Sequence, residues 1–224
     1  MIHIDHFNLT ASNVFEASHR FRAETGLGFY DGGSIAGINC NFIFPLGDTT
    51  YIEIAGIVNA FAVEDPKKRP AAWNMISQEE RFMGMCFRAD TMEEMQEIAK
   101  RLNMKVTQSP VMRIRPDGAP VQAPAVPSAA EAWPKGLPNW YCFEDRINMH
   151  PSGQPVIPAP GLVKPMGLAW VEVGGTEAEM TRWLGEPASK YPLRFNGKTP
   201  GLYALGIESD KGEIVVRRKP QTIP

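Results

Sequence analysis

The chain has 224 residues, of which 43% are hydrophobic, and a formal net charge of -2 at pH 7. This length and composition predict a globular protein of one or two domains with a substantial core. The basic residues are scattered, which argues against a nucleic-acid or anionic-lipid partner, and no apolar run approaches the roughly 20 residues of a membrane helix. We therefore expect the partner to be a small molecule.

The start of the sequence and the cysteines indicate where the protein resides. Met1 is followed at once by strand-like residues rather than by a basic segment and an apolar run, so no export signal is expected. The three cysteines, Cys40, Cys86 and Cys142, are odd in number and far apart. This pattern predicts buried free thiols in a reducing compartment. A cytoplasmic location is the resulting expectation.

Two strand-like segments near the start each carry one proton-transferring or metal-capable side chain, namely His6 in the first and Glu53 in the second. Successive side chains of a strand point to opposite faces. Regular alternation therefore puts His6 on the same face as Ile4, and His3 and Asp5 on the other face. Our hypothesis is that His6 and Glu53 point into a common cup.

The element order β-α-β-β-β is predicted three times along the chain. Each unit begins with an apolar strand that leads into a helix, and the predicted helix caps are Asn13, Thr91 and Thr176. Recurrence of one supersecondary unit indicates a duplicated module with a third copy. The predicted parts are a first module over 1–58, a linker over 59–80, a second module over 81–150 with a Pro-rich loop at 116–139, a Pro-rich connector over 151–165, and a third, truncated module over 166–224 packed on the first two.

The region between the second and third units is rich in proline. Eleven of the 20 prolines lie between Pro116 and Pro165. Proline lacks the N–H that a sheet ladder needs, so we do not expect this stretch inside a sheet. Two roles are open for it, a connecting loop or a lid that folds over the cup.

Several residues of the first unit resemble glyoxalase-like proteins of the vicinal oxygen chelate superfamily. They are Asp5 and His6 in the first strand, Asn41 in the third, and the run from Gly47 to Glu53. The resemblance implies an α+β fold in which paired βαβββ modules form a curved mixed sheet, a half-barrel cup with outer helices. A third, shorter βαβββ-like unit is expected in addition to this pair. The resemblance also implies a small-molecule substrate and, commonly, a homodimer.

The same resemblance implies divalent-metal ligands at His6 and Glu53. The second module departs from the pattern, because Gly84 or Met85 stands where a His or Gln is expected. Its last strand offers Glu144, and a one-residue shift in register decides whether this side chain lies inside the cup. Inside, it completes a one-His, two-carboxylate set for Mn, Fe, Mg or Zn. Outside, two ligands are too few, and no cofactor is expected.

Without a metal, His6 and Glu53 would form an acid/base pair. The further candidates for contact with a substrate are Asn41, Arg113, Arg115, Trp140 and His150. Arg113 and Arg115 share a strand face by alternation. If that face is the inner one, they offer forked donors for a carboxylate or phosphate, and if it is the outer one they are solvated charges.

Two classes of function are consistent with these residues. The first is a glyoxalase-like enzyme that acts on a small oxygenated molecule, which can bear a carboxylate, by isomerase, lyase or ring-opening dioxygenase chemistry. The alternative, implied by the same resemblance, is a non-catalytic protein of the bleomycin-resistance type that sequesters an aromatic or drug-like molecule. A purely structural role for His6, hydrogen-bonded within the core, is the third interpretation.

Overall fold

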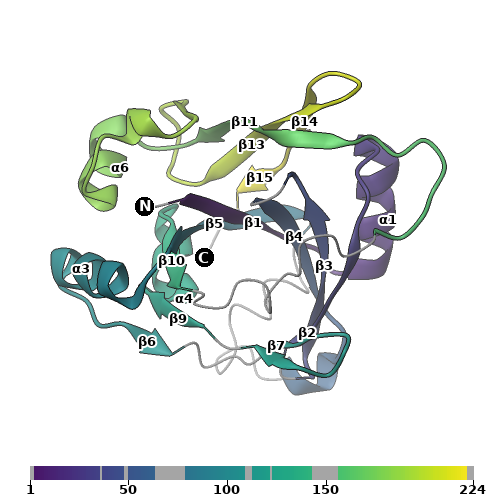
Figure 1. The fold of residues 1–224 in the computed structure, drawn as a ribbon, viewed down its shortest axis with the longest axis horizontal. Helices are drawn as coiled ribbons and strands as arrows, with labels where there is room; N and C mark the ends of the chain where they lie inside the picture. Colours follow the sequence, from purple (N-terminus) through teal and green to yellow (C-terminus); the bar gives the residue numbers. More distant parts are fainter. Residues whose placement is uncertain are drawn as a thin grey trace.

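The computed structural model describes residues 3–35, 37–47, 50–63, 79–108, 113–121, 123–142 and 156–220. In this part of the chain the strands form an eleven-stranded sheet and a four-stranded sheet. The larger sheet curls into a half-barrel, with α1, α3 and the smaller sheet on its outer side (Figure 1). None of the helices in the described ranges has the length and apolar composition needed to cross a membrane.

The larger sheet contains two modules with the same strand pairing. The first consists of β1 (His3–Thr10), α1 (Val14–Thr25), β2 (Tyr30–Ile35), β3 (Asn39–Pro45) and β4 (Tyr51–Ile57), and is followed by η1 (Ala60–Val63). The second consists of β5 (Arg81–Ala89), α3 (Met92–Leu102), β6 (Thr107–Gln108), β9 (Pro124–Val126) and β10 (Asn139–Cys142). In each module the first strand runs parallel to the last, and the other two strands follow antiparallel. The antiparallel pair β1–β5 joins the modules, which confirms the predicted α+β half-barrel of paired βαβββ units.

The Pro-rich part of the second module is more structured than predicted. It contains β8 (Pro120–Val121), β9, α4 (Ala129–Ala132) and η2 (Trp133–Lys135). Strand β9 lies between β6 and β10, so the expectation that this stretch stays outside the sheet was wrong. Pro124 is the first residue of β9, a position that tolerates a missing backbone donor. The hairpin of β7 (Arg113–Ile114) and β8 instead pairs with β2 of the first module.

The third unit has the predicted element order but a different pairing. It consists of β11 (Pro165–Val173), α6 (Glu177–Leu184), η3 (Ala188–Lys190), β12 (Leu193–Phe195), β13 (Leu202–Ser209) and β14 (Ile214–Arg217). Its first strand lies between β12 and β13, whereas β1 and β5 lie beside the last strands of their modules. The third unit therefore shares the element order of the module but not its strand pairing. After it, β15 (Lys219–Pro220) returns to pair with β5.

The helix caps form as predicted. The side chains of Asn13, Thr91 and Thr176 each accept a hydrogen bond from the backbone N–H three residues later. Gly26 and Gly185 end α1 and α6 in the left-handed conformation, which glycine adopts without steric cost. These local signals fix where the helices begin and end.

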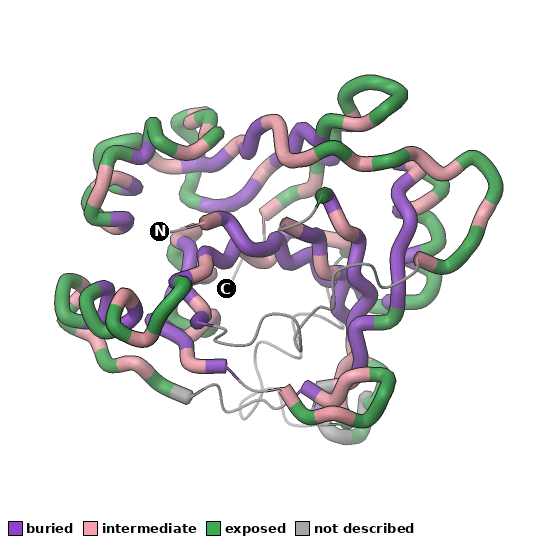
Figure 2. Tube along the Cα trace, in the orientation of Figure 1, coloured by how far each residue is buried: buried purple, intermediate pink, exposed green. Residues whose placement is uncertain are grey.

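The main core lies on the convex side of the larger sheet. Alternate residues of its strands, such as Phe7 and Ile52, pack with Phe21 of α1 and with Val171 and Leu205 of the smaller sheet. Buried residues run along these strands, and the outward sides of the helices are exposed (Figure 2). Because apolar side chains occupy the convex face, the other alternate residues of each strand point to the concave face.

The alternation predicted for β1 is interrupted at Asp5. Ile4 pairs with Phe87 and His6 pairs with the adjacent Cys86, so Asp5 is an extra residue, a β-bulge, on β1. The bulge places His6 on the face opposite Ile4, which packs in the core. The prediction that His6 shares a face with Ile4 and not with Asp5 was therefore wrong. Two consecutive polar side chains turn to the same side of the sheet.

Candidate functional site

His6 and Glu53 share the concave face of the sheet, as our hypothesis requires. In the parallel pair β1–β4, His6 is the partner of Tyr51, and Asn8 is the partner of Glu53. Partner residues of adjacent strands project to the same face. Glu53 therefore lies two residues along β4 from Tyr51, the partner of His6, with its side chain on the same face as His6.

The His6 imidazole is held on three sides. Its Nδ1 lies 2.8 Å from Asp5 Oδ2. Its ring stacks with Tyr51 of β4, at 4.8 Å between centroids and 12° between planes, and with Tyr141 of β10, at 6.0 Å and 19°. Since β4 and β10 lie on opposite sides of β1, the two phenol rings cover opposite ring faces. His6 is only 5% exposed, and its Nε2 makes no hydrogen bond to any other residue that the structure describes.

Asn41 lies on the same face with an unused amide. It is the β3 partner of Ala55, and the residue is 1% exposed. Neither its Oδ1 nor its Nδ2 has a hydrogen-bond partner among the described residues. The neighbouring Gly32 leaves room for this amide, since a Cβ there would collide with Oδ1. An unpaired buried polar group costs about 1–3 kcal/mol, and such groups in native proteins call for an explanation such as a ligand.

The two candidate arginines have different environments. Arg113 is buried. Burial raises the pKa of the Tyr30 and Tyr51 phenols, and the positive charge of Arg113 offsets part of that rise. Arg115 follows the end of β7 and forms an ion pair with Asp117 at 2.6 Å. Arg113, in β7, is therefore the arginine whose charge acts on the phenols of the concave face, whereas Arg115 lies in the turn between β7 and β8.

Burial controls the proton affinities of the surrounding groups. It raises the pKa of Tyr30 to about 12 and the pKa of Tyr51 well above its usual value. These phenols are therefore protonated at neutral pH. Burial likewise raises the pKa of the Cys86 thiol, which contacts Asn139 Oδ1 at 3.1 Å. Cys86 is a hydrogen-bond donor rather than a nucleophile.

All three cysteines are free, as predicted. Cys86 and Cys142 are buried, and Cys40 is partly exposed. Burial, and secondarily the nearby Asp31, raises the pKa of Cys40 to about 11. No thiolate is therefore expected at Cys40 or Cys86 at neutral pH.

Trp140 and His150 are the remaining predicted substrate contacts. Trp140 is the partner of Phe87 and packs in the convex core against Trp183, on the face opposite His6. The register of β10 turns Tyr141 toward the concave face instead. Glu144 and His150 lie outside the described residues.

The described residues supply two of the three predicted metal ligands, His6 and Glu53. Within these residues no group of three or more His, Cys, Asp or Glu side chains could hold an ion. The equivalent position of the second module is Gly84, the β5 partner of Asn8. The indole of Trp133 covers it, and a Cβ at Gly84 would collide with that ring. Two ligands are fewer than a stable site requires.

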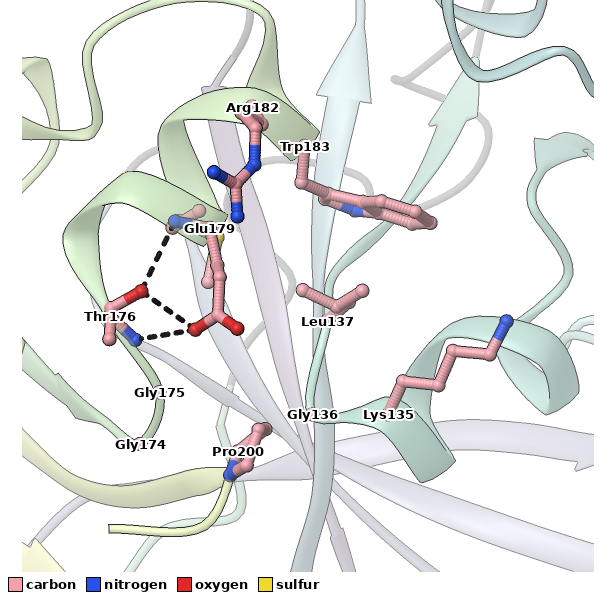
Figure 3. Close-up of a pocket in the computed structure, with 11 residues that line it drawn as sticks. Lys135, Gly136, Leu137, Gly174, Gly175, Thr176, Glu179, Arg182, Trp183 and Pro200 are labelled. Carbon is pink, nitrogen blue, oxygen red and sulfur yellow. Dashed lines mark hydrogen bonds between the residues drawn. The ribbon is translucent and has the colours of Figure 1, made fainter. Parts of the chain in front are cut away.

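A separate hollow of about 280 Å³ lies between α6 and η2 (Figure 3). It contains none of the predicted site residues. The Thr176 hydroxyl and backbone N–H both donate to Glu179 Oε2, at 2.7 and 3.0 Å, so the polar groups at this end of α6 already bond one another. The concave face, with its unpaired buried amide and its acid/base groups, is therefore the stronger candidate site.

Sequence comparison identifies the family. The glyoxalase-like domain family matches residues 4–187. The chain belongs to this family. Comparison with curated proteins gives no match.

Several solved structures are similar to this chain. A hypothetical protein from Staphylococcus aureus has 12% identity and a TM-score of 0.57, over 99% of this chain and 88% of that chain. A mutant of 4-hydroxymandelate synthase from Streptomyces coelicolor has 11% identity and a TM-score of 0.47, over 99% and 64%. Methylmalonyl-CoA epimerase from Mycobacterium tuberculosis has 10% identity and a TM-score of 0.42, over 65% and 90%. The first shows the fold of this glyoxalase-like protein, and the other two scores are too low to support more.

Two features of this glyoxalase-like protein were not predicted from the sequence. They are the Asp5 carboxylate beside His6 and the Trp133 indole over Gly84. The glycine at position 84 was the available signal for Trp133, because an isolated glycine in a strand often marks a close approach. Nothing in the local sequence marks the bulge that turns Asp5 toward His6.

Proposed function

We propose that this glyoxalase-like protein is an enzyme that moves a proton on a small, oxygenated, carboxylate-bearing molecule bound at the concave face. One observation supports this most strongly. An imidazole paired with a carboxylate and clamped between two phenols shares a sheet face with a second carboxylate, Glu53, and with the Asn41 amide, which has no partner among the described residues. This combination offers a base, a second proton-transferring group and a hydrogen-bond donor on one face of the sheet.

Each side chain has a role in the proposed reaction. His6 Nε2 takes the proton from the carbon next to a carbonyl group, because Nδ1 is engaged by Asp5. The Asn41 Nδ2 group donates to the carbonyl oxygen as negative charge develops there. The proton returns to the substrate from His6 directly, or through Glu53, which accepts it from His6 and passes it on. The guanidinium of Arg113 binds the substrate carboxylate.

The arrangement supports a class of reactions that share one first step. Isomerisation, elimination by a lyase, and some ring openings all begin with proton abstraction beside a carbonyl. The divalent metal remains a prediction that depends on Glu144 as third ligand. The homodimer and the cytoplasmic location also remain predictions.

Proton exchange with solvent tests the proposal without knowledge of the product. We would incubate the protein in D₂O with a panel of small 2-oxo and 3-oxo carboxylates and follow the loss of carbon-bound protons by NMR. The wild type should accelerate exchange for at least one compound, and His6→Gln and Glu53→Gln should lower the rate by about 10²–10⁴-fold. Arg115→Gln, which alters the arginine that pairs with Asp117 in the turn between β7 and β8, is the control and should retain the rate. Exchange that is unchanged in His6→Gln would contradict the proposal.

Ligand sequestration is the second candidate, and one observation favours it. Tyr30, Ile43 and Tyr51 form a buried apolar cluster with Val156, separate from the main core. Such a surface suits an aromatic ligand. Tight binding of aromatic compounds together with no exchange of any panel member would support sequestration over catalysis.

A further inference from the structure

Asp5 is the buried charge that the proposed reaction does not use directly. Its side chain is 2% exposed, and a buried carboxylate is costly unless it is paired. Among its partners in the described part of the chain are two nitrogens, His6 Nδ1 at 2.8 Å from Oδ2 and Arg88 Nη1 at 3.7 Å from Oδ1. Each carboxylate oxygen thus faces a different nitrogen.

The pairing continues outward to the surface. Arg88 Nε donates to Asp90 Oδ1 at 3.1 Å, and Asp90 Oδ2 lies 3.5 Å from His3 Nε2. The side chain of Arg88 is 11% exposed and that of Asp90 is 42% exposed. Arg88 is therefore held between the two carboxylates, which fixes the position of its guanidinium beside Asp5.

We propose that Asp5, held by Arg88, is a positioning residue that keeps the proton of neutral His6 on Nδ1 and leaves the Nε2 lone pair for the concave face. An ionised carboxylate can only accept hydrogen bonds, so the ring nitrogen that faces it must carry the hydrogen. The β-bulge is the device that permits this, because regular alternation would separate two adjacent side chains across the sheet. The stacked rings of Tyr51 and Tyr141 hold the imidazole plane, so that the orientation and the tautomer are both set.

Arg88 makes the proposal sharply testable. In Asp5→Asn, the new amide has one oxygen and one NH₂ group. Because a guanidinium has only donors, the amide oxygen should turn to Arg88, and the NH₂ group should face His6. His6 Nδ1 must then accept, which moves the proton of the neutral ring to Nε2.

The experiment is ¹⁵N NMR of histidine-labelled protein at a pH where His6 is neutral, with the His6 signals assigned by comparison with His6→Gln. The wild type should show a protonated Nδ1 and an unprotonated Nε2, and Asp5→Asn should show the reverse. Asp90→Asn, which removes a carboxylate one step farther out, is the matched control and should keep the wild-type pattern. In the double variant Asp5→Asn/Arg88→Met, no guanidinium holds the amide oxygen. The amide can then turn its oxygen toward His6, and the proton of the neutral ring should return to Nδ1.

The inference rests on the proposed function only in naming His6 as the base. Different results would overturn the role of Asp5 and the proposed reaction. A wild-type spectrum with the proton on Nε2 overturns the role of Asp5 even if the protein is active, and this result needs no variant to fold. An unchanged tautomer in folded Asp5→Asn overturns it as well. The predicted spectra without any exchange activity would support the positioning of His6 and contradict the proposed reaction. With an active substrate, Asp5→Asn should lower the exchange rate by about 10²–10⁴-fold.

Discussion

Two asparagines of the concave half-barrel should respond in opposite ways to the same substitution. Asn41 has two buried amide atoms without partners among the described residues, whereas Asn139 accepts hydrogen bonds from Trp133 Nε1 at 2.9 Å and from Cys86 at 3.1 Å. Leucine has a similar shape to asparagine and no polar atoms. Asn41→Leu should therefore stabilise the ligand-free protein, and Asn139→Leu should destabilise it.

The magnitudes follow from the hydrogen bonds. Each unpaired buried group at Asn41 costs about 1–3 kcal/mol, and crowding against the neighbouring strand offsets part of the gain by about 1–3 kcal/mol. We expect a net increase of about 1–3 kcal/mol in the free energy of unfolding, or a rise in Tm of roughly 2–4 °C per kcal/mol. Asn139→Leu leaves the Trp133 N–H without its acceptor and should lower the free energy of unfolding by about 2–4 kcal/mol.

Urea denaturation of the ligand-free protein, followed by circular dichroism, measures both changes. The same Asn41→Leu protein should lose binding or turnover of any ligand of the concave face. This combination, greater stability with lost function, is the signature of a polar group retained for a ligand. A loss of more than about 1 kcal/mol in Asn41→Leu would show the expectation to be wrong, because it would mean that the amide is satisfied in the free protein.

Three further predictions concern the rest of the molecule. Gly84→Val should displace the Trp133 indole and cost about 1–3 kcal/mol, detected as a lower urea midpoint with a changed near-ultraviolet circular dichroism spectrum; an unchanged spectrum would contradict it. Native Cys86 should resist alkylation by iodoacetamide at pH 8, because burial raises its pKa, and it should react only after unfolding. Glu172 and Glu186 have lowered pKa values, caused first by hydrogen bonds from Asn196 and Lys190 respectively. The stability that these two carboxylates add is therefore present above the ordinary carboxyl pKa of about 4.3. It is lost as the pH falls through their lower pKa values in the folded protein. Glu172→Gln should reduce the acid-induced loss of stability, and an unchanged pH profile would count against this assignment.

Local signals were sufficient for much of the fold. The caps at Asn13, Thr91 and Thr176 depend on a side chain and a backbone N–H three residues apart, which sequence contains. The strands of the paired modules were recognisable because their apolar residues, which cover the convex face, recur in the sequence. The recurring order of capped helices and apolar strands therefore indicated the half-barrel.

Register and pairing were harder to predict because they depend on distant residues. The bulge at Asp5 is defined only against β5, about eighty residues later, and it changed which side chains accompany His6. Strand β9 has too few residues to give an alternating pattern, and the third unit has the right element order but a different neighbour for β11. The inward position of Tyr141, rather than Trp140, is a further consequence of register.

The proposed function depends above all on whether the concave face around His6, Glu53 and Asn41 binds the small molecule on which this protein acts. Chemical-shift mapping of isotope-labelled protein, titrated with the same panel of small oxo carboxylates, answers this question. We predict that the largest changes occur at the His6 ring and the Asn41 side-chain amide and are lost in Asn41→Leu. Changes confined to the hollow between α6 and η2, or equally large in Asn41→Leu, would place the ligand elsewhere and exclude the concave face as the site.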